Sequence, residues 1–125
     1  MMPAVSRHTA LLLDIDGTLL DMARSPERVI VPADLVRALD SLAHELSGAL
    51  AFVSGRSLES IDRLFAPFRS AAIGAHGGEI RSAAGQVTRA PPISQPVRDL
   101  FAQLAQSTPG LLLEDKGAGL ALHYR

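Results

Sequence analysis

A short apolar segment, Thr9–Leu13, leads directly into two carboxylates, Asp14 and Asp16, which are followed closely by Gly17. An unbroken apolar run of this length that ends in turn residues predicts a buried β-strand. Residues i and i+2 of an extended segment point to the same side, so the two carboxylates project together from the end of the strand.

Two carboxylates at one point repel each other unless a cation or a shared proton lies between them. Mg²⁺ prefers oxygen ligands and leaves room for phosphate oxygens, so Asp14 and Asp16 are candidate magnesium ligands. One carboxylate could attack a phosphoryl group while the other moves the proton. An ordinary turn after a strand would look the same at this point of the sequence, and both interpretations stay open.

Two more apolar segments, Ala49–Val53 and Ala71–Ala75, predict a second and a third strand. Apolar residues at helical spacing predict a helix between the first two strands, starting after Pro32 and ending at Gly48. A second helix, capped by Ser57, precedes the third strand. Strands and helices that alternate in this way form a parallel sheet with right-handed crossovers.

Ligands bind at the carboxyl ends of the strands in such a sheet, where Asp14, Asp16, Ser54 and His76 would gather. Ser54 has a short hydroxyl group suited to phosphate oxygens, although it also fits a plain strand-to-helix turn. His76 either contacts the substrate or only shapes its loop. Arg56 either binds phosphate in a bidentate manner or lies in solvent at the start of a helix.

The pattern changes at Ala90-Pro91-Pro92. A predicted helix and two strand-like segments, Gly110–Glu114 and Gly119–Tyr124, follow without continuing the parallel alternation. If the first strand continues past Glu114, alternation puts Glu114 and Lys116 on one face, where they form either an exposed ion pair or a sugar-binding pair. We therefore expect two domains, residues 1–89 and 90–125.

Several stretches resemble the trehalose-6-phosphate phosphatases of the haloacid-dehalogenase-like superfamily. Asp-Ile-Asp-Gly-Thr-Leu at 14–19 is similar to the first superfamily motif, and Ala-Phe-Val-Ser-Gly-Arg at 51–56 to the second. Gly-Ala-His-Gly-Gly-Glu-Ile-Arg at 74–81, Leu-Glu-Asp-Lys-Gly at 113–117 and Ala-Leu-His-Tyr-Arg at 121–125 resemble the phosphatase family itself. The resemblance implies an α/β fold: part of a Rossmann-like core with three parallel strands, then the start of an α-β-β cap that covers the active site.

The resemblance also implies a role for each motif residue. Asp14 would be the nucleophile that forms an aspartyl-phosphate, and Asp16 the general acid and base whose backbone carbonyl joins Asp14 in binding Mg²⁺. The other matching positions would bind the substrate, trehalose 6-phosphate. They are Thr18, Ser54, Gly55, Arg56 and His76 in the core, and Glu114 and Lys116 in the cap.

Composition narrows the function further. The net charge of −1 gives no reason to expect nucleic acid or an anionic membrane as a partner. The absence of cysteine excludes disulfides and thiolate metal sites. No apolar stretch is long enough to cross a bilayer, and no signal peptide is evident, so we expect a cytoplasmic protein.

The chain departs from the family pattern after Arg125, because two later motifs, a lysine and an acidic pair, are not present. Lys116 is the only lysine. We expect the N-terminal half of a trehalose-6-phosphate phosphatase, in which the strand before Asp14 becomes an apolar edge that invites pairing. The alternatives are a non-catalytic remnant, a module that self-associates or pairs with a complementary C-terminal half, and a phosphatase of another sugar phosphate.

Overall fold

The fold was analysed in a computed structural model, which describes residues 5–21 and 29–124. Arg125, at the end of the last motif, lies outside the described residues. The chain divides into two compact units, Met1–Thr88 and Arg89–Arg125. Among the described helices, none has the length and apolar character needed to cross a membrane.

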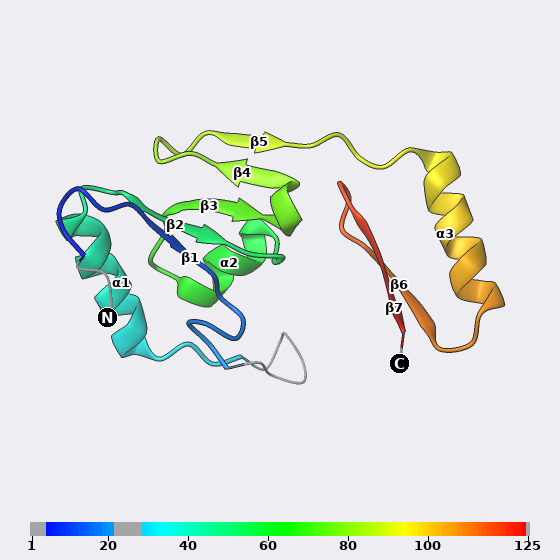
Figure 1. The fold of residues 1–125 in the computed structure, drawn as a ribbon, viewed down its shortest axis with the longest axis horizontal. Coiled ribbons are helices and arrows are strands. Elements are labelled where there is room, and N and C mark those ends of the chain that lie inside the picture. The colour runs from blue at the N-terminus through cyan, green and yellow to red at the C-terminus, as the bar shows by residue number, and fades with distance from the viewer. Residues whose placement is uncertain (1–4, 22–28, 125) are drawn as a thin grey trace. The chain divides into compact units, whose positions relative to one another are not determined.

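A five-stranded sheet in the order β1-β2-β3-β4-β5 forms the first unit, and its last strand ends at the boundary between the units (Figure 1). The first three strands run parallel and β4 runs antiparallel to β3. The strands are β1 (Leu11–Leu13), β2 (Leu50–Val53), β3 (Ala71–Gly74), β4 (Glu79–Arg81) and β5 (Val87–Arg89). The predicted α/β class with three parallel strands is confirmed, and two further strands extend the sheet beyond β3.

Two helices connect the parallel strands, α1 (Ala33–Glu45) between β1 and β2 and α2 (Leu58–Phe65) between β2 and β3. Both crossovers step in the same direction along the sheet, so right-handed connections place both helices on one face. The core cluster agrees, because it joins Leu39 of α1 and Ile61 of α2 to Phe52 of β2.

Phenylalanines form the centre of this core. The rings of Phe52 and Phe65 stack with their centroids 4.6 Å apart, and Phe68 meets Phe52 edge-on at 6.0 Å. Both arrangements are favoured by the quadrupole of the aromatic ring. Three of the four phenylalanines therefore pack together, and aliphatic residues fill the rest of the interior.

The observed strands β1 and β3 are shorter than the sequence predicts. β1 begins at Leu11 rather than Thr9, because its register with β2 starts at the Leu11–Leu50 pair. β3 ends at Gly74 because the 3₁₀ turn η2 (Ala75–Gly77) begins there. β1 has a neighbour on one side only among the described strands, so the predicted edge is confirmed.

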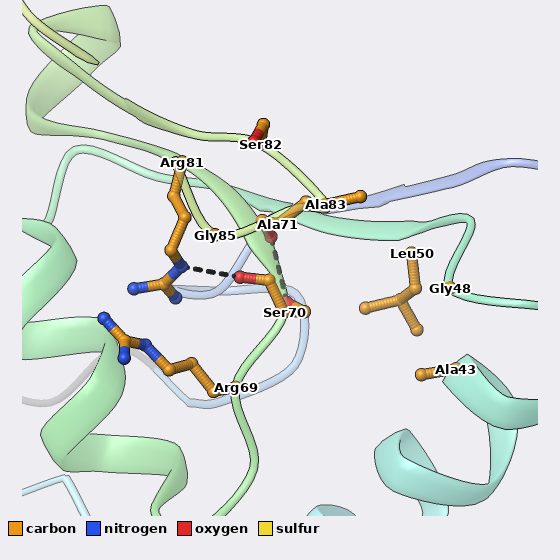
Figure 2. A pocket seen from close by; sticks show the side chains of 10 residues that line it. All are labelled: Ala43, Gly48, Leu50, Arg69, Ser70, Ala71, Arg81, Ser82, Ala83 and Gly85. Atoms are coloured by element: carbon orange, nitrogen blue, oxygen red, sulfur yellow. Dashed lines mark hydrogen bonds between the residues drawn. The ribbon is translucent and has the colours of Figure 1, made fainter. Parts of the chain in front are cut away.

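A buried arginine ties β4 to α2. The Arg81 side chain is 3% exposed and donates two hydrogen bonds to the Asp62 carboxylate, at 2.8 and 2.7 Å, and one to the Ser70 carbonyl, at 2.9 Å. Arg69 also pairs with Asp62, at 3.1 Å. Figure 2 shows Arg69, Ser70 and Arg81 in the wall of a small cavity.

This cavity has a volume of about 250 Å³ and is lined by the starts of β2 and β3, including Leu50 and Ala71. Since the strands are parallel, it lies at the opposite edge of the sheet from Asp14. The cavity therefore plays no part in the site that follows the strand ends.

The second unit consists of α3 (Gln95–Ser107) and an antiparallel hairpin of β6 (Leu111–Asp115) and β7 (Leu120–Tyr124). Arg98 of α3 fixes the hairpin turn: it forms an ion pair with Asp115 and donates to the Gly117 carbonyl at 2.8 Å and to the Ile93 carbonyl at 2.9 Å. The predicted α-β-β order of this segment is confirmed.

The buried ion pair predicts a clear effect on stability. Asp62→Ala leaves the Arg81 guanidinium buried without a counterion, which should lower the free energy of unfolding by about 3 kcal/mol. Glu59→Ala is the matched control on the same helix, because it breaks an exposed pair with Arg63 and should cost less than about 1 kcal/mol. Urea unfolding of both variants tests this. Equal losses would contradict the assigned role of Arg81.

Candidate functional site

After the end of β1, one side chain points into the core and the carboxylates on either side of it point outward. Ile15 is fully buried, whereas Asp14 is exposed and Asp16 is half-buried, as the alternation of an extended chain requires. Thr18 Oγ1 donates a hydrogen bond to Asp14 Oδ2 at 2.7 Å. Gly17 turns the chain with a φ of 85°, a conformation that glycine adopts without steric cost.

An ion pair joins the end of β1 to the end of β2. Arg56 donates from Nε to Asp16 Oδ2 at 2.7 Å and from Nη2 to Asp16 Oδ1 at 2.6 Å. The Arg56 side chain is 12% exposed and that of Asp16 36%, so this bidentate pair is partly shielded from water. The structure thus places Arg56 on a carboxylate of the site, while its contact with phosphate stays a prediction.

Ser54 is buried at the end of β2, where its Oγ accepts a hydrogen bond from the Arg56 backbone N–H at 3.2 Å. The neighbouring strand supports the same loop, because the Ala75 N–H donates to the Arg56 carbonyl at 2.7 Å. The backbone around Ser54 and Arg56 is therefore held from both sides by hydrogen bonds.

His76 packs directly on Gly55. A Cβ atom on Gly55 would lie 2.4 Å from Cε1 and 2.7 Å from Nε2 of the His76 ring, so a side chain there would require the exposed imidazole to move. His76 itself has a φ of 53°, in the left-handed region, and its N–H donates to the Ser54 carbonyl at 3.3 Å. The motif glycine and the motif histidine thus fit together, which the sequence did not predict.

Glu79 is a site-supporting residue that the sequence analysis missed. Its Oε2 accepts a hydrogen bond from the Leu58 N–H at 2.7 Å, in the first turn of α2. Ser57 caps the same helix as predicted, accepting from the Ser60 N–H at 3.2 Å. The first N–H groups of a helix need acceptors, and this need was the signal that could have pointed to a residue such as Glu79. The sequence does not show which residue meets it, because Glu79 lies 21 residues after Leu58.

In the second unit, Glu114 and Lys116 lie together as predicted, with Nζ 3.5 Å from Glu114 Oε1. The other carboxylate oxygen, Oε2, lies 2.8 Å from His123 Nε2. The hydrogen bond with His123, helped by the positive charge of Lys116, lowers the pKa of Glu114 below its usual range. Both oxygens of an ionised carboxylate therefore have partners here.

The donor set at the end of β1 suits Mg²⁺ in an open site. Asp14 supplies a carboxylate and Asp16 a backbone carbonyl, both of them oxygen donors, which Mg²⁺ prefers. No cluster of three or more acidic, histidine or cysteine side chains occurs within 5–21 and 29–124. Such a set would leave several coordination positions to water and phosphate, which is usual for Mg²⁺.

Comparison with known proteins agrees with these motifs. Residues 12–125 match the Trehalose-phosphatase family. The chain belongs to the trehalose-phosphatase family. The match covers both units, from the end of β1 to the last motif, so the resemblance stated from the motifs is confirmed.

Individual members are similar over nearly the whole chain. A probable trehalose-phosphate phosphatase of Sinorhizobium fredii is 48% identical over 119 residues, covering 93% of this chain and 44% of that protein. The trehalose-6-phosphate phosphatase of Escherichia coli is 38% identical over 126 residues, covering 98% and 47%. The chain thus spans about half the length of these curated trehalose phosphatases.

Solved structures show the same fold. The C-terminal domain of the C. albicans trehalose-6-phosphate phosphatase superposes with a TM-score of 0.68 at 25% identity, covering 91% of this chain and 41% of that one. A trehalose-6-phosphate phosphatase related protein superposes with a TM-score of 0.62 at 26% identity, covering 92% and 51%.

The contact between Gly55 and His76 predicts that a side chain at Gly55 displaces the imidazole ring. Gly55→Ala should destabilise the chain by about 1 kcal/mol, because the new methyl group removes the exposed ring from its packing position. Gly119→Ala is the control, since a Cβ there meets nothing within 4 Å. Thermal unfolding measures both variants, and a double-mutant cycle with His76→Ala should show coupling. A Gly55→Ala chain as stable as the control would contradict the contact.

Proposed function

We propose that the site at the carboxyl ends of β1 and β2 serves the hydrolysis of trehalose 6-phosphate. The observation that carries this proposal is the placement of Asp14 and Asp16 on one strand end, beside Arg56 and Ser54 from the next strand. Membership of the trehalose-phosphatase family supports the choice of substrate. We further propose that residues 1–89 form the core domain and residues 90–125 part of the cap.

In the proposed reaction the Asp14 carboxylate attacks phosphorus and the bond to the sugar oxygen breaks. Asp16 protonates that leaving oxygen, then removes a proton from the water that hydrolyses the aspartyl-phosphate and releases phosphate. The hydrogen bond from Thr18 orients Asp14, and the Arg56 pair holds Asp16 at the same edge. We also assign phosphate binding to Arg56, whose planar guanidinium suits phosphate oxygens.

Phosphate would be bound by the Ser54 hydroxyl and by the loop that Gly55 and His76 shape. Bound Mg²⁺, held by the Asp14 carboxylate and the Asp16 carbonyl, would neutralise charge on the phosphate. In the second unit, Glu114 and Lys116 offer an acceptor and donors side by side, which suits the hydroxyl groups of a disaccharide.

A second candidate function is a half-protein that requires a complementary partner. Both helices cover the same face of the parallel sheet, and on its other face Leu12 is 69% exposed and Val53 37% exposed. Parallel sheets are normally covered on both faces, and β1 also forms an open edge. These apolar surfaces favour either self-association or pairing with a separate C-terminal half.

The nucleophile assignment predicts the outcome of a phosphate-release assay. The chain should release phosphate from trehalose 6-phosphate when Mg²⁺ is added, and Asp14→Asn should lower the rate by at least about 10³-fold. Asp40→Asn, an exposed carboxylate on α1, is the matched control and should leave the rate unchanged. Faster release from sucrose 6-phosphate would favour another sugar phosphate, and no release would favour the half-protein candidate.

A further inference from the structure

We propose that His123 is a positioning residue for disaccharide recognition: it orients the Glu114 carboxylate so that the hairpin can bind the hydroxyl groups of trehalose. This inference rests on the proposed function, to which it adds a residue that the family motifs left without a role. His123 lies on β7 and Glu114 on β6, so the contact depends on the hairpin register.

The register places the two residues on one face of the hairpin. Leu112 pairs with His123 and Glu114 pairs with Ala121, so His123 and Glu114 are diagonal neighbours on the same side. Their side chains are 53% and 49% exposed, which leaves them accessible to a ligand while Nε2 and Oε2 stay 2.8 Å apart. Lys116 extends the same group at the start of the turn.

The direction of the hydrogen bond follows from the charge of Glu114. Its lowered pKa keeps the carboxylate ionised near neutral pH, and an ionised carboxylate can only accept. The proton of this bond must therefore lie on His123 Nε2. In the neutral ring Nδ1 is then an acceptor, so the group offers carboxylate and imidazole acceptors beside the ammonium donors of Lys116.

Each contact fixes a different oxygen of Glu114. Lys116 forms an ion pair with Oε1 at 3.5 Å, the longer of the two contacts, whereas His123 holds Oε2 at 2.8 Å. The turn between the strands is already fixed through Arg98 of α3. Without His123, the Glu114 carboxylate would keep only its longer contact with Lys116, so its orientation would be less well defined.

Trehalose itself, which lacks the phosphate, is the probe that tests this role on the full chain. We titrate it up to about 100 mM and follow the His123 ring resonance by NMR. The His123 resonance should shift, and His123→Ala should weaken binding about fivefold, the loss expected when one acceptor is no longer oriented. His123→Gln should restore the affinity, because its amide can donate to Glu114 from nearly the same place.

The controls separate this role from general damage to the fold. His44→Gln changes an exposed histidine on α1 and should bind trehalose like the unmodified chain. Equal affinity of His123→Ala, a His123 resonance that does not shift, or no trehalose binding at all would each overturn the proposal, as would weakened binding that glutamine does not rescue.

The same variants distinguish this proposal from the proposed function. Asp14→Asn should bind trehalose normally while losing phosphate release, because the probe has no group for Asp14 to attack. If the unmodified chain binds trehalose in a His123-dependent way but does not release phosphate, the result would count against the proposed hydrolysis alone. Intact hydrolysis with trehalose binding that ignores His123 would count against the positioning role alone.

Discussion

The ion pair between Asp16 and Arg56 is the contact on which the rest of the first unit's site depends. It joins the ends of two neighbouring parallel strands through two hydrogen bonds, at 2.7 and 2.6 Å, in a partly buried position. The Arg56 backbone is held in turn, because its N–H donates to the Ser54 hydroxyl and its carbonyl accepts from the Ala75 N–H. Loss of the Arg56 guanidinium would therefore release the carboxylate that the proposed reaction needs.

A second set of contacts supports this pair from the side of β3. His76 packs on Gly55, and Glu79 satisfies a backbone N–H at the start of α2. These contacts keep the loop after β2 in one conformation, since the loop is bounded by a helix start that is capped twice. The trehalose-phosphatase motif at 74–81 thus has a structural explanation beyond any direct contact with substrate.

Local rules in the sequence were enough to predict the main features of the fold. Alternation along a strand predicted that Asp14 and Asp16 would point away from Ile15, and capping preferences predicted the start of α2 at Ser57. The same alternation placed Glu114 and Lys116 together. Each of these features depends on neighbours within a few residues, so it can be read without knowing the tertiary structure.

The features that the sequence did not predict depend on distant residues. Arg56 has a long side chain, and nothing local shows that it turns to Asp16, 40 residues earlier in the chain. The steric need for Gly55 comes from a ring on another loop, and Glu79 acts on a helix 21 residues away. The hydrogen bond between His123 and Glu114 likewise requires the hairpin register.

The most direct test of the account is whether Asp14 carries the phosphoryl group. Fluoroberyllate with Mg²⁺ mimics a phosphorylated aspartate, and ¹⁹F NMR detects it when it is bound, without any need for turnover. The account predicts bound fluorine resonances in the unmodified chain and in Asp40→Asn, and none in Asp14→Asn. Resonances that persist in Asp14→Asn, or that never appear in the unmodified chain, would contradict it.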